Sequence, residues 1–157
     1  MTSPEYLEKL NAPTPWSTKM NLSAISFNRS PGKTIASWSH GVGGFLLTIR
    51  YEPQPGKGDA LRAWSEDRVK ELRGCDKVVG AHYFLGDPSA SLPTKEQELR
   101  GMPDAAAGCV MVIESYDAAL LEEAREEFLT AAQFSAAGAE PTIELGSFRL
   151  VHTVEQD

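Results

Sequence analysis

Long hydrophobic runs, clustered basic residues and abundant cysteines are all missing from this 157-residue sequence. The longest apolar stretches, Phe45–Ile49 and Cys109–Ile113, fall far short of the roughly 20 residues that a membrane-spanning helix needs. Lysine and arginine total 15 against 22 aspartates and glutamates, which gives a formal net charge of -7. We therefore expect neither a membrane partner nor a nucleic-acid partner, since both favour basic surfaces.

Cysteine is limited to Cys75 and Cys109, and the first residues have neither the basic nor the apolar region of a signal peptide. Isolated cysteines are among the most often buried residues. We interpret both as free, buried thiols in a reducing compartment. The sequence thus predicts a cytoplasmic protein with an ordinary globular composition, 41% hydrophobic and 24% charged.

Complete catalytic and cofactor-binding motifs are missing as well. The Gly-Lys-Thr of residues 32–34 resembles the end of a phosphate-binding loop, but Phe27 stands where that loop needs a glycine. The three histidines, His40, His82 and His152, are far apart along the chain and show no metal-ligand spacing. We therefore expect neither a metal nor another cofactor.

From residue 45 onward the hydrophobic pattern is regular. It predicts, in order, a strand over 45–51, a helix of about fifteen residues begun by Asp59, strands over 77–85 and 109–114, a helix begun by Asp117, and a strand over 146–154. Gly138 and Pro141 are expected to end the second helix. This β-α-β-β-α-β order predicts a ferredoxin-like α+β fold with a four-stranded antiparallel sheet over residues 41–157.

Residues 1–40 have a different character, and we interpret them as an N-terminal arm. Ser3, Pro4 and Glu5 predict a short helix over 4–11, and residues 34–38 are expected to be extended. The connection over 86–108 is predicted to hold another short helix, begun by Thr94 and ended by Gly101.

Both faces of the predicted sheet are apolar. In the first strand, for example, Leu46 and Thr48 alternate with Phe45, Leu47 and Ile49. Because β-α-β crossovers are right-handed, both helices lie on one face of the sheet, whereas a sheet that is apolar on both faces is normally covered on both. We therefore expect a homodimer in which two sheets pack face to face.

His82 is the candidate catalytic residue, since it interrupts the otherwise apolar stretch 79–84. A histidine in such a place is more often a core or interface residue than a functional one. The functional interpretation is that of a general base, because an imidazole exchanges protons near neutral pH. Gly80, without a side chain, leaves room for a ligand beside it.

Four further residues are candidate ligand-binding residues: Trp64, Tyr83, Arg50 and His152. Trp64 on the first helix would form, with His82 and Tyr83, a small apolar pocket for a flat organic molecule. Arg50 needs a carboxylate partner, and Glu114 on the third strand is the expected one. The structural alternatives, a core tryptophan and an ion pair at the end of the sheet, remain open.

The pattern from Phe45 to Val154 resembles the dimeric α/β-barrel superfamily, which includes antibiotic-biosynthesis-type monooxygenases and EthD-like proteins. Trp64 matches the tryptophan of the Trp-Tyr-x-x-Glu-His pattern in the EthD-like branch, whereas Ser65, Arg68 and Val69 replace its other three residues. The resemblance implies a cofactor-independent oxygenase or isomerase acting on a small aromatic or lactone-like molecule. The alternative is a non-catalytic small-molecule-binding or structural module.

Overall fold

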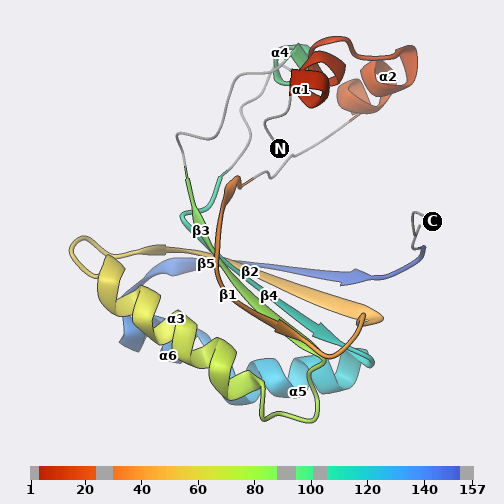
Figure 1. The fold of residues 1–157 in the computed structure, drawn as a ribbon. Helices are drawn as coiled ribbons and strands as arrows, with labels where there is room; N and C mark the ends of the chain where they lie inside the picture. The colour runs from red at the N-terminus through yellow and green to blue at the C-terminus, as the bar shows by residue number, and fades with distance from the viewer. Residues whose placement is uncertain (1–3, 24–29, 88–94, 101–105, 153–157) are drawn as a thin grey trace. The chain divides into compact units, whose positions relative to one another are not determined.

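The computed structural model describes residues 4–23, 30–87, 95–100 and 106–152 (Figure 1). The chain forms two compact units, which we call the helical unit and the sheet unit. The helical unit comprises Met1–Pro31 and Asp87–Ala106, and the sheet unit comprises Gly32–Gly86 and Ala107–Asp157. No helix within the described ranges is long and apolar enough to cross a membrane.

Three short helices make up the described part of the helical unit: α1 (Pro4–Asn11), α2 (Pro15–Ser23) and α4 (Lys95–Arg100). The sequence predicts α1 and α4, although Thr94 and Gly101, the expected ends of α4, lie outside the described residues. It does not predict α2. Pro15 begins this helix because proline fits the first helical position, and the Thr14 hydroxyl accepts a hydrogen bond from the Ser17 amide at 3.1 Å.

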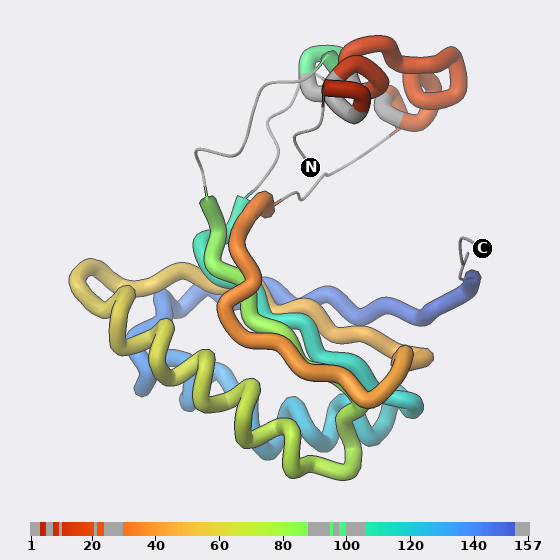
Figure 2. The backbone as a smooth tube through the Cα atoms, in the orientation of Figure 1, coloured from red at the N-terminus to blue at the C-terminus, as the bar shows by residue number. Residues whose placement is uncertain are grey.

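Five strands form one antiparallel sheet in the order β1-β3-β4-β2-β5 (Figure 2). Their bounds are Gly32–Ser39 for β1, Phe45–Pro53 for β2, Gly80–Gly86 for β3, Cys109–Ser115 for β4 and Ala139–Arg149 for β5. The order β3-β4-β2-β5 with its two helical crossovers is that of the predicted ferredoxin-like fold. The prediction of four strands is wrong, because β1 pairs with β3 and extends the sheet by one edge strand.

The last strand begins and ends earlier than predicted. β5 covers Ala139–Arg149 rather than residues 146–154, of which 153 and 154 lie outside the described residues. Pro141 lies within β5, where it was expected to act as a breaker. An edge strand tolerates proline, because only one side of its backbone has to pair.

A helix that the sequence did not predict, α6 (Ala131–Ala137), stands between α5 (Ala118–Phe128) and β5. The Thr130 hydroxyl accepts a hydrogen bond from the Gln133 amide, and the Gln133 side chain accepts one from the Thr130 amide. This reciprocal arrangement begins the helix. Gly138 ends it with a φ of 100°, a left-handed conformation that glycine adopts without strain.

The other two helices begin in different ways. The Asp117 carboxylate accepts hydrogen bonds from the amides of Ala119 at 2.8 Å and Leu120 at 3.2 Å, so it caps α5 as predicted. Helix α3 (Gly58–Leu72) begins after Lys57, with no side-chain cap. Asp59, expected to be the capping residue, therefore lies inside the first turn.

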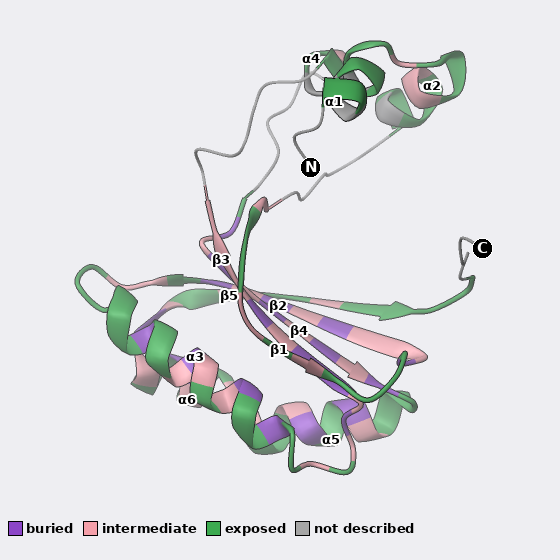
Figure 3. Ribbon diagram, in the orientation of Figure 1, coloured by how far each residue is buried: buried purple, intermediate pink, exposed green. Residues whose placement is uncertain are grey.

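Helices α3, α5 and α6 all cover the same face of the sheet, which we call the helix face (Figure 3). Strand residues that point toward these helices are buried: Leu47, Ile49, Tyr51, Ala81, Tyr83, Cys109, Met111 and Ile113. We call the other side the open face, since no described helix of the sheet unit lies on it. The hydrophobic core of this unit thus lies between the helix face and the helices.

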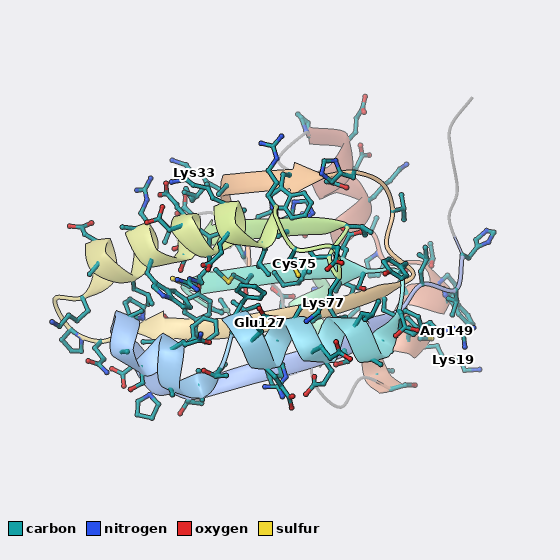
Figure 4. All side chains as sticks on the ribbon, turned by 90° about the horizontal axis from the view of Figure 1, so that it is seen from below. Lys19, Lys33, Cys75, Lys77, Glu127 and Arg149 are labelled. Atoms are coloured by element: carbon teal, nitrogen blue, oxygen red, sulfur yellow. The ribbon has the colours of Figure 1, made fainter. Side chains whose placement is uncertain are left out.

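The outer side of α5 carries charged residues that pair with one another and with Lys77 (Figure 4). Lys77 Nζ lies 3.0 Å from Glu127 Oε2 and 3.6 Å from Glu123 Oε2, and its hydrogen bond with Glu127 raises the pKa of Lys77. Such exposed pairs contribute little to stability. This surface is a solvated helix face.

Candidate functional site

His82 and Tyr83, expected to line one pocket, point to opposite faces of the sheet, because neighbouring strand residues alternate. Tyr83 is completely buried on the helix face, whereas His82 lies on the open face with 16% of its side chain exposed. Trp64, on α3, packs with the helix side. The structure therefore does not bring Trp64, His82 and Tyr83 together around one cavity.

The space beside Trp64 is occupied by packed side chains. The Phe134 ring centroid lies 4.8 Å from that of Trp64 and 4.7 Å from that of Tyr51. The Arg68 guanidinium lies 5.6 Å from the Trp64 ring centroid, in a cation–π contact. Trp64 is half-buried and packs against the core, as the structural alternative for this residue describes.

A small buried polar cluster lies in the core beside these rings. The Tyr51 hydroxyl is 2.7 Å from Ser65 Oγ, and the Tyr83 hydroxyl is 3.5 Å from Cys109 Sγ. Burial raises the pKa values of Tyr51, Tyr83 and Cys109 above their ordinary values. All three groups therefore remain protonated at neutral pH, and we assign them to the core and not to chemistry.

Arg50 lies on the open face and pairs with the neighbouring edge strand. Its Nη1 is 3.0 Å from Oε2 of Glu144, which stands directly opposite it on β5. Glu114, the partner expected for Arg50, lies beside His82. His152 is exposed and follows the end of β5, so it does not lie on a strand as expected.

His82 joins a serine and a carboxylate across three strands, which we call the histidine cluster: Ser37, His82 and Glu114. Ser37 Oγ on β1 is 2.7 Å from His82 Nδ1. On the other side of the ring, His82 Nε2 is 3.4 Å from Glu114 Oε1 on β4. The second Glu114 oxygen accepts a hydrogen bond of 3.0 Å from the Gly43 amide, which fixes the carboxylate in place.

The two neighbours of His82 favour one tautomer of the imidazole. A carboxylate only accepts hydrogen bonds, so Glu114 favours the form with its proton on Nε2. Nδ1 is then the nitrogen that accepts from the Ser37 hydroxyl. A ring oriented by a carboxylate on one side, with a basic nitrogen on the other, has the arrangement of a general base.

Strand register brings the histidine cluster together. Ser37 is directly opposite His82, and the His40 amide donates to the Val79 carbonyl at 2.8 Å. His40 and Val79 are therefore a hydrogen-bonded pair. Hydrogen-bonded and non-hydrogen-bonded pairs alternate along two antiparallel strands, so Ser37 and His82, three pairs away, form a non-hydrogen-bonded pair, in which side chains approach most closely. Gly80 stands opposite Glu114, so no side chain separates Glu114 from His82.

Sequence reasoning identified His82 but missed Ser37, and it gave Glu114 another partner. The signal for Ser37 is weak: two serines, Ser37 and Ser39, alternate with Trp38 at the end of the stretch 34–38 that was expected to be extended. That alternation places both serines on one face. Only the pairing of β1 with β3 shows that this face is the one that His82 occupies.

Apolar side chains surround the histidine cluster on the open face: Leu46, Phe84, Val110, Val112 and Phe148. The Phe84 ring centroid is 6.3 Å from that of His82. Phe148 packs over Gly146, where an added Cβ would lie only 2.9 Å from its ring. The surroundings of the histidine cluster are therefore largely apolar.

The histidine cluster offers a hydroxyl, an imidazole and a carboxylate in contact with one another, which are the groups of acid–base and nucleophilic chemistry. Within the described ranges, no three histidine, cysteine, aspartate or glutamate side chains form a group that could hold a metal ion.

Comparison with protein-family models finds no match to the chain, and comparison with curated proteins finds none either. Two solved structures are similar. Rv0793 from Mycobacterium tuberculosis is 14% identical, with a TM-score of 0.48, and the match covers 71% of this chain and 98% of that one. An anthrone oxidase-like protein is 12% identical, with a TM-score of 0.51, and the match covers 78% of this chain and 55% of that one.

The chain therefore spans about half the length of the anthrone oxidase-like protein. At 12% identity this likeness concerns the fold alone, and it agrees with the ferredoxin-like order of the strands. The class of protein defined here is a ferredoxin-like α+β protein with one extra edge strand. Its open sheet face carries a serine–histidine–glutamate cluster.

Proposed function

We propose that the sheet unit acts on a small, flat aromatic or lactone-like molecule, with His82 as the base and without a cofactor. The observation that carries the proposal is the histidine cluster, in which Glu114 orients an imidazole whose Nδ1 faces Ser37 at 2.7 Å. The apolar residues around the cluster would hold the ring system of the substrate. Rotation of the Ser37 hydroxyl would free Nδ1 to receive the proton of the substrate.

Removal of a proton opens two reactions without a cofactor. An electron-rich carbanion can react with molecular oxygen, as in the conversion of anthrone and oxygen to anthraquinone and water. A lactone-like molecule can take the proton back at another carbon, which is an isomerisation. Anthrone is the first substrate to test, because an anthrone oxidase-like protein shares the fold.

We expect the protein to consume oxygen and form anthraquinone from anthrone faster than buffer does, and His82→Gln to lower this excess rate about 10²-fold, since general-base catalysis is worth that much or more. Oxygen uptake and anthraquinone absorbance measure both quantities. His40→Gln is the matched control, because His40 lies in an exposed loop and packs against Trp38. An unchanged rate in His82→Gln would rule out His82 as the base.

The alternative is a non-catalytic binding module. The packing of the helix face favours it, because the rings around Phe134 occupy the space between helix and sheet where a catalytic pocket was expected. The open face is then the candidate ligand surface. Titration of the protein with anthrone under nitrogen separates the two cases. Binding without any oxidation above the buffer rate would identify the binding module.

We also propose that a second copy of the chain covers the open face and encloses the histidine cluster. A stable pair buries about 1,600 Å² in total, and Phe148, 58% exposed and opposite Leu46 on this face, would be part of that area. Phe148→Glu should convert a dimer into a monomer at micromolar concentration in analytical ultracentrifugation.

Leu145→Glu is the matched control for this prediction. Leu145 is 54% exposed on the same strand, but it stands opposite Ile49 and so lies on the other side of the sheet. The Leu145→Glu protein should remain a dimer. A wild-type protein that sediments as a monomer, or two variants that dissociate equally, would refute dimerisation through the open face.

A further inference from the structure

We propose that Ser37 is a nucleophile and that the open face hydrolyses aryl esters through an acyl-serine. This activity goes beyond the proposed proton abstraction and shares with it the base, His82, and the carboxylate that orients it, Glu114. The 2.7 Å contact between Ser37 Oγ and His82 Nδ1 is within hydrogen-bond reach of a nucleophile and its base. Ser37 is exposed in the single chain and lies on the edge strand β1, so an ester can reach its hydroxyl from the edge of the sheet even where a second copy covers the open face.

The three groups have the order that nucleophilic serine chemistry needs. Ser37 contacts the imidazole, the imidazole contacts Glu114 at 3.4 Å, and the Gly43 amide holds Glu114 at 3.0 Å. The tautomer with its proton on Nε2 leaves Nδ1 as the proton acceptor for Ser37. Glu114 is a positioning residue here, since it acts on the reaction through His82.

The backbone supplies a donor for the developing oxyanion. The His40 amide donates to Val79 and so points toward β3. Successive amides of a strand point to opposite sides, so the Ser37 amide, three residues earlier, points away from β3 to the outer edge of the sheet. An acyl group on Ser37 Oγ can turn its carbonyl oxygen toward the amide of the same residue. Backbone amides in this role stabilise the tetrahedral intermediate of acyl transfer.

The reaction balances with an ester and water alone. Ser37 Oγ bonds to the carbonyl carbon while its proton passes to His82 Nδ1; the bond to the aryl oxygen then breaks, and that oxygen takes the proton from Nδ1. Water, deprotonated by Nδ1, next attacks the acyl carbon, and the serine hydroxyl is restored. The products are a carboxylic acid and a phenol, whose flat ring suits the apolar surroundings of the cluster.

The test uses diisopropyl fluorophosphate, in which the serine oxygen displaces fluoride from phosphorus and forms a stable ester. We expect one label per chain, mapped to Ser37 by peptide mass spectrometry, together with hydrolysis of p-nitrophenyl acetate above the buffer rate. Ser37→Ala should remove both signals. Ser39→Ala is the matched control and should keep both, because Ser39 Oγ donates to the Gly41 carbonyl and not to His82.

Two Glu114 variants distinguish positioning from a structural effect. Glu114→Gln should slow labelling about 10²-fold, and Glu114→Asp, which restores the carboxylate, should recover part of the rate. A wild-type protein that takes up no label, or a label that persists in Ser37→Ala, would overturn the proposal. Equal labelling rates in Glu114→Gln and the wild type would overturn the role of the cluster as a unit.

The failure of this inference and the failure of the proposed function are distinguishable. Labelling of the wild-type protein by diisopropyl fluorophosphate reports on Ser37 as a nucleophile, whereas oxidation of anthrone by the same protein reports on His82 as a base. Labelling of Ser37 without anthrone oxidation would support the nucleophile alone. Anthrone oxidation without labelling would overturn the nucleophile and leave the base intact.

Discussion

Replacing Phe134 with alanine is expected to lower the free energy of unfolding of the sheet unit by about 3–5 kcal/mol, the range for truncating a buried aromatic residue. Phe134 is completely buried on α6, and its ring centroid lies within 4.8 Å of those of Tyr51 and Trp64. Alanine would leave a cavity where α6 packs on α3 and would remove both ring contacts, each worth about 0.5–1.5 kcal/mol. Denaturation by urea, followed by tryptophan fluorescence, measures the loss.

Two variants test the physical reason for this expectation. Phe134→Leu keeps much of the buried volume and should cost about 1–2 kcal/mol, since the loss is then mainly that of the ring contacts. Tyr116→Ala removes an aromatic side chain that is 60% exposed and should change stability by no more than about 0.5 kcal/mol. A loss below about 1 kcal/mol in Phe134→Ala would show that α6 does not anchor the core.

The sequence predicts β2, β3 and β4 closely because local signals define each of them, whereas it places β5 too late because Gly138 and Pro141 were interpreted only as the end of a helix. The strand at β2 alternates apolar residues and ends at a proline and glycine turn, and Asp117 begins its helix through a local hydrogen bond. These signals depend on neighbours in the chain and not on the fold. The same local logic could have found α6, since Thr130 and Gln133 have the spacing of a capping box.

Strand β1 could not be predicted in the same way. Apart from Ser37, Trp38 and Ser39, its residues show no clear alternation of apolar and polar side chains, because all of β1 is exposed or half-buried and no face of it has to be apolar. A register shift between Thr34 and Ala36 interrupts what alternation there is. What defines β1 is its pairing with β3, a long-range contact that the sequence does not display.

The candidate site was half predictable for the same reason. His82 is noticeable in the sequence because it interrupts an apolar strand, and burial of an imidazole calls for a partner. The identity of that partner depends on which strands are neighbours. The order β1-β3-β4 places Ser37 on one side of His82 and Glu114 on the other, whereas the predicted sheet had no strand at the Ser37 position.

The buried hydroxyls on the helix face lead to a second stability prediction, in which Ser65→Ala is more destabilising than Tyr51→Phe. Ser65 Oγ lies 2.7 Å from the Tyr51 hydroxyl and donates to the Leu61 carbonyl at 2.8 Å. Tyr51→Phe removes one hydrogen bond and leaves Ser65 its bond to Leu61, so we expect a loss of about 1 kcal/mol. Ser65→Ala leaves the Tyr51 hydroxyl in the core without this partner, at a cost of about 1–3 kcal/mol.

The double variant Ser65→Ala/Tyr51→Phe decides whether the unpaired hydroxyl is the cause. It removes both polar groups, so it should be more stable than Ser65→Ala alone, although it carries one more substitution. Burial also raises the pKa of Tyr51, so the unfolded state releases the phenol proton first as pH rises above about 10, and the wild type loses stability there. Tyr51→Phe should weaken that alkaline loss. Strictly additive losses in urea denaturation would contradict the proposed coupling between Tyr51 and Ser65.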